Sequence, residues 1–551
     1  MSFEKKRQIL VDSIRVPLDA TESAIIQKAR EKMKRAGLPT STLHFRLYKK
    51  SVDARRREEI RFVCSAVAEG EIAPERYPVE RLRRADARLL TVESLSPVAG
   101  DEELYARPLV VGMGPAGLFA ALLLAREGYA PLLIDRGGDV KERTASVERF
   151  HREGVLNVES NVQFGAGGAG TFSDGKLITR INDPRCGFVL ETLVEAGAPE
   201  EILTRAKPHV GTDLLREVVD RMLSRIVSLG GEIRYHCRME DFSPSSEGGL
   251  LVDTSCGRIH CGAMILAPGH SARDTYVRLL EKNFAIEPKP ISVGVRAEHL
   301  QVDIDTALYG DFAGDPRLGP AEYSLSDTRG ERGVYTFGMC PGGEVVAAAS
   351  EEGGLVVNGM SHHARNGRNA NAAVAVSVGC EDYAPVEGSR ALGAIEFQRS
   401  IERAAYAAGG GEYVAPVMTL GDFLEGKRGT EPSRVQPSYR GGRTRVGDFS
   451  EVFPSFVVES LRYGFRSFGK KLSGYDAPDT VLTAAETRTS APLRLLRNGE
   501  TLTAVGQDRI YPCGEGAGYA GGITSAAVDG LRVAEALISR FARPREVKGG
   551  F

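Results

Sequence analysis

A chain of 551 residues with 42% hydrophobic and 26% charged side chains has the size and composition of a globular protein with several domains, which excludes a disordered or fibrous chain. No run of 18 apolar residues predicts a membrane-spanning helix, and residues 1–7 lack the apolar stretch of a secretory signal. We therefore expect a cytoplasmic protein with no membrane partner. Eight cysteines without a Cys-x-x-Cys pair predict neither a metal site nor a redox dithiol, and we interpret them as buried thiols in a reducing compartment.

Residues 1–97 predict a separate, small α/β unit with a basic surface. We expect strands at 13–18, 43–48 and 61–67 and a helix that starts at Thr21, an order that fits a ferredoxin-like module. Residues 1–60 contain 15 Lys and Arg against 8 Asp and Glu, a net charge of +7, whereas the whole chain carries −2 and the remainder therefore −9. Nucleic acid is an alternative partner for such a module, but without an aromatic RNP-like strand a solvated basic surface is favoured.

After a linker at about 97–103, residues 104–275 predict the first part of a dinucleotide-binding domain. A buried strand at 109–111 leads through a GxGxxG turn into an Ala- and Leu-rich helix, and a second strand ends at Asp135. In this motif the first glycine permits the turn, the second lets a pyrophosphate approach, and the third lets the helix pack on the strand. Pro115 suits the first helical turn, whose free N–H groups bind phosphate. We expect Asp135 to accept a hydrogen bond from a ribose hydroxyl. The three glycines are Gly112, Gly114 and Gly117.

The segment 509–530 favours FAD over NAD. It predicts a short strand, the pair Gly514 and Glu515, and a glycine-rich entry to a helix that begins near Gly522 and runs to about Phe541. FAD needs this second site because its ribityl chain and isoalloxazine extend well beyond the pyrophosphate. We expect Glu515 to accept a hydrogen bond from a ribityl hydroxyl, and the positive end of the helix to face the N1–C2=O edge of the flavin.

Two further segments complete the predicted cofactor site. The loop 165–176 has four glycines within six positions, followed by polar side chains, and predicts backbone contact with a flat, polar ligand. Lys176 in this loop is expected to stabilise a reduced flavin or to bind the pyrophosphate, with an exposed structural role as the alternative. The segment 262–270 predicts a strand that ends in Ala-Pro-Gly, after a meander at 232–236, 249–253 and 257–260.

The order of these motifs resembles the glutathione-reductase-like FAD superfamily, and several longer segments resemble one bacterial family, the FAD-dependent dehydrogenases labelled "NAD(FAD)-utilizing dehydrogenase". The segments are 165–176, 207–213, 269–275, 340–344, 486–490 and 512–522. Ala166 and His362 depart from the family pattern, where Glu and Tyr are expected. The resemblance implies an α/β protein with a Rossmann-type FAD-binding fold in two parts, 104–275 and 480–551. Residues 276–479 are expected to form an inserted antiparallel-sheet substrate domain over the flavin face.

The residues expected to contact FAD lie in all of these segments. They are Gly112, Gly114, Pro115, Ala116, Gly117, Asp135, Arg136, Gly167, Gly168, Gly170, Thr171, Ser173, Lys176, Gly269, Gly514, Glu515, Gly521, Gly522 and Ile523. The insert has no second GxGxxG in a strand–turn–helix context, since Gly409-Gly-Gly411 follows an Ala-rich helix and is typical of a helix end. A dedicated NAD(P)H domain is therefore not expected, and the electron donor or acceptor is a separate, unidentified molecule.

The candidate catalytic residues are Arg488, His209 and His362. Arg488, between two threonines, has the planar fork that binds a substrate carboxylate or phosphate, and pairing with a carboxylate of the core is an equal alternative. The histidines are candidates for proton transfer near neutral pH, although a structural histidine is the commoner case.

The favoured function is therefore a FAD-dependent oxidoreductase, a dehydrogenase or reductase that acts on a small or medium polar, anionic substrate by hydride transfer with the flavin. Two alternatives stay open. One is a tRNA-modifying flavoprotein that uses the basic N-terminal module, and the other is a non-catalytic flavin-binding protein.

Overall fold

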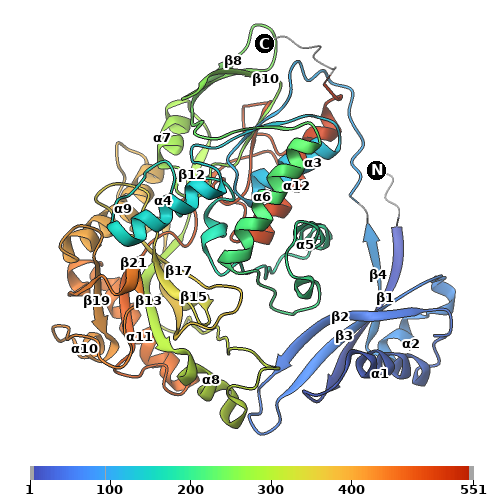
Figure 1. The fold of residues 1–551 in the computed structure, drawn as a ribbon. Helices are drawn as coiled ribbons and strands as arrows, with labels where there is room; N and C mark the ends of the chain where they lie inside the picture. The colour runs from blue at the N-terminus through green and yellow to red at the C-terminus, as the bar shows by residue number, and fades with distance from the viewer. Residues whose placement is uncertain (1–4, 94, 545–551) are drawn as a thin grey trace.

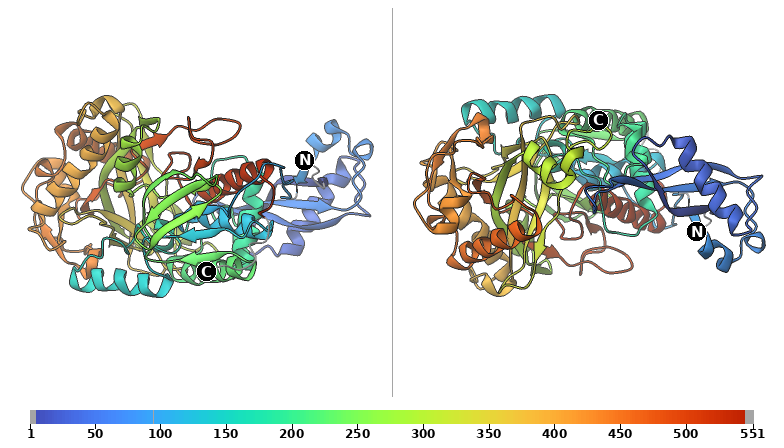
Figure 2. Two further views of the ribbon diagram at one scale, coloured as in Figure 1. Left: turned by 90° about the horizontal axis from the view of Figure 1, so that it is seen from above. Right: turned by 90° about the horizontal axis from the view of Figure 1, so that it is seen from below.

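The computed structural model describes residues 5–93 and 95–544. It contains a small N-terminal module, a nucleotide domain of residues 104–290 and 487–544, and a cap of residues 291–486 that is inserted into the nucleotide domain. Figure 1 shows the N-terminal module in blue at one end of the molecule, and the views from above and below show it projecting from the other two parts (Figure 2).

The N-terminal module is a four-stranded antiparallel sheet with the order β2-β3-β1-β4, and its helices connect β1 to β2 and β3 to β4. Its core is formed by buried side chains such as Ile9, Ile25 and Phe62. Each of the three strands expected from the sequence overlaps a strand of this sheet. The elements are β1 (Lys5–Val16), α1 (Glu22–Arg35), β2 (His44–Asp53), β3 (Arg61–Glu69), α2 (Val79–Arg84) and β4 (Ala87–Glu93).

The linker that follows is attached along its length to the nucleotide domain. Gly100 N–H donates to the carbonyl of Ile538, and the carboxylate of Glu102 pairs with Arg509 and Arg540. An added Cβ at Gly100 would lie 2.3 Å from the carbonyl oxygen of Arg540, so the backbone approach requires glycine. The N-terminal module is therefore attached to the nucleotide domain through the linker. It is also attached through strand β2, where Lys50 forms backbone hydrogen bonds with residues 204–206.

The nucleotide domain contains a parallel sheet of five short strands in the order β23-β11-β5-β6-β7. Helix α3 packs against α12 on this sheet. Almost all apolar side chains of the two helices are buried. The elements of the first part are β5 (Leu109–Val111), α3 (Pro115–Arg126), β6 (Leu132–Ile134), α4 (Val140–Glu153), α5 (Arg185–Glu195), α6 (Thr212–Ser228), β7 (Glu232–Arg234), β8 (Met239–Pro244), β9 (Leu250–Thr254), β10 (Gly257–Cys261), β11 (Met264–Leu266), α7 (Arg273–Glu281) and β12 (Ile286–Pro288). Those of the second part are β22 (Leu493–Leu495), β23 (Ile510–Pro512) and α12 (Ile523–Arg540).

One strand of the expected meander was assigned wrongly. Residues 232–234 form the edge strand β7 of the parallel sheet, and the antiparallel meander is β10-β9-β8 instead. Only two side chains of β8 are buried in the structure. Its sequence, Met-Glu-Asp-Phe-Ser-Pro, is accordingly polar and lacks the hydrophobic pattern that indicates a strand.

The cap is built on a seven-stranded sheet in the order β14-β15-β18-β13-β21-β19-β20, antiparallel except for the pair β19 and β20. Helix α9 ends at Ala408 and is capped by Gly409, as expected from the glycine triplet. The boundary expected at 480 is wrong, because β21 pairs with β13 and β19 and belongs to the cap. The cap elements are β13 (Ile291–Leu300), α8 (Gln301–Tyr309), β14 (Ser326–Asp327), β15 (Val334–Cys340), β16 (Glu344–Ala347), β17 (Val357–Met360), β18 (Asn369–Val378), α9 (Arg390–Ala408), β19 (Ala415–Thr419), α10 (Leu420–Glu425), β20 (Thr444–Val446), α11 (Ser455–Lys471) and β21 (Val481–Glu486).

Candidate active site

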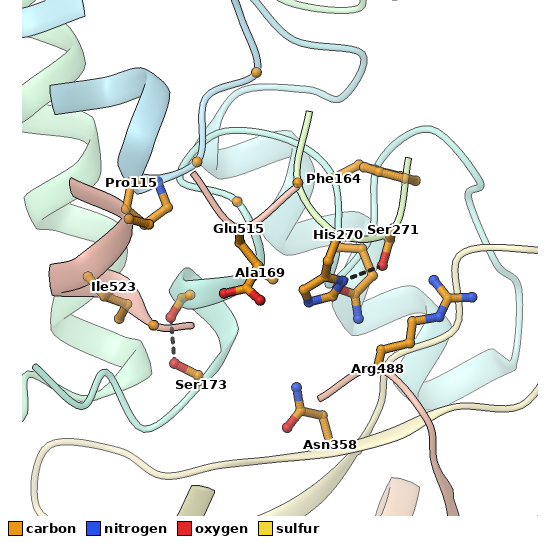
Figure 3. A pocket seen from close by; sticks show the side chains of 18 of the residues that line it. Pro115, Phe164, Ala169, Ser173, His270, Ser271, Asn358, Arg488, Glu515 and Ile523 are labelled. Carbon is orange, nitrogen blue, oxygen red and sulfur yellow. Dashed lines mark hydrogen bonds between the residues drawn. The ribbon is translucent and has the colours of Figure 1, made fainter. Parts of the chain in front are cut away.

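A cavity of about 370 Å³ lies where the nucleotide domain meets the cap (Figure 3). Its wall on the nucleotide side is formed by the carboxyl ends of the parallel strands and by the glycine loop, the place where ligands bind in open α/β sheets. Strands β13, β15, β17 and β21 supply the cap side through Arg296, Cys340, Asn358 and Glu486. The sequence thus brings segments from both parts of the nucleotide domain and from the insert to one site.

The glycine turn after β5 has the geometry that its sequence predicts. Gly112 has a φ of +100°, and a Cβ there would lie 2.1 Å from the carbonyl oxygen of Ala267, which follows the neighbouring strand β11. A Cβ at Gly117 would lie 1.9 Å from the carbonyl oxygen of Gly112, so helix α3 packs on its turn only with glycine at this position. Gly114 and Pro115 line the cavity at the start of α3, whose free N–H groups are suited to phosphate.

Asp135 and Arg143 hold the backbone around this turn. The Asp135 carboxylate, which lines the cavity, accepts hydrogen bonds from the N–H groups of Met113, Gly137 and Gly165 at 2.8–3.0 Å. Arg143, from helix α4, is fully buried and donates to five backbone carbonyls between residues 161 and 168. Burial lowers the pKa of Arg143 to about 9, and the nearby Asp135 opposes this effect. The two side chains therefore keep the glycine turn and the glycine loop together, a role for Asp135 in addition to the expected ribose contact.

The glycine loop packs directly on the turn and on the start of helix α12. A Cβ at Gly168 would lie 2.7 Å from the Cα of Gly114, and a Cβ at Gly170 would lie 2.9 Å from the side chain of Ile523. Ser173 donates to the carbonyl of Gly170 at 2.7 Å, and this contact is drawn in Figure 3. Glycines in this loop thus serve close backbone packing as well as the cavity surface.

Glu515 faces the cavity from the loop that precedes α12 (Figure 3). Burial raises the pKa of Glu515 to about 7, although Lys289 acts in the opposite direction. Within the described residues its buried Oε1 atom has no hydrogen-bond partner. Burying a carboxyl oxygen without a hydrogen-bond partner costs free energy. We therefore infer that this atom accepts a hydrogen bond from a bound ligand.

These observations fit FAD. Gly269, Gly521 and Gly522 line the cavity, and an added Cβ at any of them would meet no heavy atom within 4 Å. The space beside them is therefore open to a ligand that approaches the backbone closely. Together with the start of α3 and the unpartnered Glu515 oxygen, it provides separate surfaces for a pyrophosphate and for a hydroxylated chain.

Lys176 lies at the cavity end of a buried charge cluster. Its ammonium is 3.0 Å from Asp174, which also pairs with Arg365, and Arg365 in turn pairs with Glu322. Lys207 is 3.4 Å from Glu322. This cluster, which we call the lysine cluster, thus has three cations, of which Lys207 is more than half exposed, against two carboxylates, and Lys176 borders the cavity.

Arg488 borders the cavity from a second cluster, which we call the arginine cluster. Its guanidinium contacts Glu402 through two nitrogens, at 3.0 and 3.1 Å, and donates to Ser350. Glu402 also pairs with Arg273, and Glu351 pairs with Arg273 and Arg399. Of the two alternatives for Arg488, the structure shows the pairing with a buried carboxylate. Three arginines again face two carboxylates, so this cluster also carries a surplus positive charge.

The two histidines predicted to be catalytic do not line the cavity. His209 is buried and hydrogen-bonded to the carbonyl of His363, and burial lowers its pKa to about 4. The side chain of His362 is half exposed and lies 4.0 Å from Asp213. His270, which sequence reasoning missed, faces the cavity instead, with its Nδ1 2.9 Å from the Ser271 hydroxyl (Figure 3). Burial lowers the pKa of His270 to about 4, and Arg488 and Arg273 act in the same direction.

Fourteen of the nineteen residues expected to contact FAD line the cavity: Gly112, Gly114, Pro115, Asp135, Arg136, Gly168, Gly170, Ser173, Lys176, Gly269, Glu515, Gly521, Gly522 and Ile523. The other five are placed directly behind its wall: Ala116, Gly117, Gly167, Thr171 and Gly514. For example, a Cβ at Gly514 would lie 2.6 Å from the Cβ of Ala116. These five support the cavity without forming its surface.

The described residues, 5–93 and 95–544, contain no cluster of His, Cys, Asp and Glu side chains suited to a metal ion. In the same part of the chain, no helix combines the length and the hydropathy needed to cross a bilayer.

Comparison with known proteins identifies relatives of the whole chain. An uncharacterized protein of Clostridium beijerinckii is 45% identical over 540 residues, which are 98% of this chain and 100% of the relative. A family model described as "FAD-dependent protein, C-terminal domain-like" matches residues 290–489, close to the bounds of the cap. A second model, for a domain of unknown function, matches residues 8–69 of the N-terminal module.

Solved structures are only distantly similar. The halogenase PltM is 13% identical, with a TM-score of 0.38 over 79% of this chain and 71% of the halogenase. CtdE, solved in complex with FAD, is 10% identical, with a TM-score of 0.32 over 79% of this chain and 83% of CtdE. The atypical thioredoxin reductase TRi from Desulfovibrio vulgaris Hildenborough is 20% identical, with a TM-score of 0.18 over 30% of this chain and 36% of the reductase, so that only about a third of its length is matched. These TM-scores are too low to support an argument.

Proposed function

Because this chain belongs to one flavoprotein family with its clostridial relative, and FAD is its cofactor, we propose that it is an oxidoreductase for a small or medium anionic substrate. The observation that carries the proposal is the position of the cavity. Its nucleotide side has the surfaces that FAD requires, and its cap side is bordered by two clusters with a surplus of positive charge.

Bound FAD supplies the chemistry, because a flavin accepts or donates a hydride. The protein contributes binding and orientation. The start of α3 binds phosphate, the buried Arg143 keeps the glycine loop in place, and the free oxygen of Glu515 accepts a hydrogen bond from a hydroxyl group. Burial raises the pKa of Glu515 to about 7, even though the charge of Lys289 lowers it, so this carboxyl is able to take up or release a proton near neutral pH.

The charge on the cap side supports an anionic substrate. Lys176 and Arg488 each extend from a cluster in which cations outnumber carboxylates, and both lie on the cavity wall. An anion in the cavity is attracted by such a surplus. His270 stays neutral at pH 7, since its pKa is about 4, and therefore offers the substrate a hydrogen bond without a further charge.

The glutathione-reductase-like arrangement of the nucleotide domain is part of this proposal. It is supported by a parallel sheet whose outer strand β23 comes from the C-terminal part. The strand order β2-β3-β1-β4 supports the ferredoxin-like interpretation of the N-terminal module. We further infer that electrons are exchanged with a separate molecule, and we propose no nucleic-acid partner.

An anaerobic screen tests the function. The purified protein is first treated with heat or acid, and the released cofactor is identified by chromatography. Carboxylates, phosphates and their uncharged analogues are then added without oxygen, and bleaching of the flavin absorbance is followed. Lys176→Met should weaken reduction by the anionic compounds alone, whereas the exposed Lys141→Met serves as the matched control. Reduction by uncharged analogues that is as fast as reduction by the anions would contradict the proposed substrate class.

A further inference from the structure

Two cysteines that are distant in sequence lie together at the end of the cavity beside Asp135. Cys237 is buried, follows strand β7 and lines the cavity, and its N–H donates to the carbonyl of Asp135 at 2.7 Å. Cys256 lies in the turn between β9 and β10 and is exposed to solvent. The expectation that all eight cysteines are buried is therefore wrong for Cys256, and Cys186 and Cys380 are partly exposed.

The turn that carries Cys256 is held tightly against the segment that carries Cys237. The N–H of Ser255 donates to the carbonyl of Arg238 at 2.9 Å, and the N–H of Arg238 donates to the Ser255 hydroxyl at 2.9 Å. The hydroxyl of Thr254 accepts from the Cys237 thiol at 3.4 Å and from the N–H of Cys256 at 3.2 Å. Thr254 thus contacts both cysteines, and Arg238, the neighbour of Cys237 in sequence, pairs with Ser255, the neighbour of Cys256.

The two sulfur atoms differ in access. The Cys256 thiol donates to the carbonyl of His236 at 3.2 Å on the surface, where a small oxidant reaches it. Burial raises the pKa of Cys237, and the neighbouring Cys256 thiol adds to this effect. Because the thiolate is the reactive form, Cys256 is the first of the two to react and Cys237 the second.

We propose that Cys237 and Cys256 form a reversible disulfide under peroxide and that this bond latches the wall of the cofactor cavity. The inference needs the cofactor at the cavity but does not depend on the proposed substrate or reaction. It makes the retention of FAD sensitive to oxidation.

The reaction proceeds in two balanced steps. The Cys256 sulfur attacks one oxygen of hydrogen peroxide, an S–O bond forms, the O–O bond breaks, and water leaves, so that Cys256 becomes a sulfenic acid. The Cys237 sulfur then attacks the Cys256 sulfur, the S–S bond forms, the S–O bond breaks, and the hydroxide departs as water with the Cys237 proton. Two thiols lose two electrons, and one peroxide is reduced to two waters. A dithiol reductant reverses the bond.

The bond would add a covalent link between the cavity wall and the turn that carries Cys256. The segment 236–239 follows β7 and supplies Cys237, Arg238 and Met239 to the cavity. A covalent link restrains this segment from moving outward, and a ligand that lies against it leaves more slowly. The oxidised protein should therefore release FAD several-fold more slowly than the reduced protein.

Peptide mapping of the FAD-loaded protein tests the bond. After treatment with hydrogen peroxide and blocking of free thiols, we expect one peptide pair joined through Cys237 and Cys256, lighter by two hydrogens and separated by dithiothreitol. Cys256→Ser should abolish the pair. Cys237→Ser should leave a sulfenic or further oxidised acid at Cys256, and Cys380→Ser, at a partly exposed cysteine elsewhere, should leave the pair unchanged. Recovery of Cys237 as a free thiol while Cys256 is oxidised would overturn the disulfide.

Flavin retention tests the latch separately. Oxidised and reduced wild-type protein and oxidised Cys256→Ser are diluted, and the flavin that remains bound is measured over time by fluorescence. Slower release from the oxidised wild type alone supports the latch, and equal rates in all three samples would overturn it. Neither measurement uses a substrate, so a failure here is distinct from a failure of the proposed oxidoreductase function.

Discussion

Arg488 and Glu402 form a bidentate ion pair at the edge of the cavity, with nitrogen–oxygen distances of 3.0 and 3.1 Å. Burial alone raises the pKa of Glu402, but Arg273 and Arg488 more than reverse the effect and hold this pKa well below its ordinary value. The pair joins helix α9 to the segment after β21. It therefore stabilises the junction between the cap and the nucleotide domain.

Arg488→Ala should destabilise the protein by roughly 3 kcal/mol, the lower end of the range for breaking a buried ion pair, because Glu402 keeps its contact with Arg273. Arg488→Lys should recover less than half of this loss, since an ammonium cannot make the two parallel hydrogen bonds that a guanidinium makes to a carboxylate. Denaturant unfolding measures both, and flavin content is followed in parallel. An unchanged free energy of unfolding together with weaker substrate turnover would instead assign Arg488 to a direct contact with the substrate.

Two glycine substitutions should have different effects. Gly117→Ala places a Cβ 1.9 Å from the Gly112 carbonyl oxygen, so it should cost about 3 kcal/mol and remove most of the bound flavin. Gly521→Ala meets no heavy atom within 4 Å, so this variant should unfold as the wild type does but bind FAD more weakly. Thermal unfolding and the ratio of flavin to protein separate the two. Equal behaviour would mean that the open space beside Gly521 is not part of the cofactor site.

Glu515 should make stability depend on pH. Its pKa of about 7 in the folded protein exceeds the ordinary 4.5, so the folded state binds the proton more tightly. The associated stability is fully present below about pH 4.5 and is lost as the pH rises to about 7, by at most about 3 kcal/mol. Unfolding at a series of pH values should show this loss in the wild type relative to Glu515→Gln. The exposed Glu247→Gln should follow the wild type, and a parallel course for all three would refute the assignment.

The N-terminal module should be dispensable for flavin binding if the linker is kept. A chain that starts at Leu95 retains Glu102, which pairs with Arg509 and Arg540, whereas a start at Leu104 removes it. We expect the longer chain to hold FAD as the full protein does and the shorter one to be less stable. Loss of flavin from the longer chain would show that the module contributes to the cofactor site.

NAD(P)H should reduce the flavin slowly, because the sequence has one GxGxxG in the required context. Stopped-flow absorbance without oxygen measures the rate. Saturable reduction on the order of 10 per second, a typical enzymatic turnover, would reveal a nicotinamide site that the motif search missed.

Fourteen of the residues expected from the sequence to contact FAD line the cavity, because local rules determine where they lie. The turn at Gly112, the entry to α3 and the approach to Gly522 depend on neighbours in the chain, and the geometry requires glycine at Gly112 and Gly117. His270 was within reach of the same rules, since it follows the carboxyl end of a parallel strand, where ligands bind.

Residues that depend on tertiary contacts were not predicted. Arg143 lies in a helix with many charged residues, where an arginine normally faces solvent, and only the fold places it under the glycine loop. The role of Arg488 was open between two alternatives because its partner Glu402 is distant in sequence. The limit of the cap was misplaced because β21, a short apolar strand, fits either sheet by its pattern alone.

The strand order of the nucleotide domain also constrains how the chain folds. Strand β11 pairs on one side with β5 and on the other with β23, which begins at Ile510. During synthesis the cap is complete before β23 leaves the ribosome. Until then one edge of β11 is unpaired, a state prone to aggregation. Early folding of the cap would bring its two ends together, because β13 pairs with β21. The chain that follows would then place β23 beside the unpaired edge of β11. Folding of the inserted cap would thus help to complete the parallel sheet.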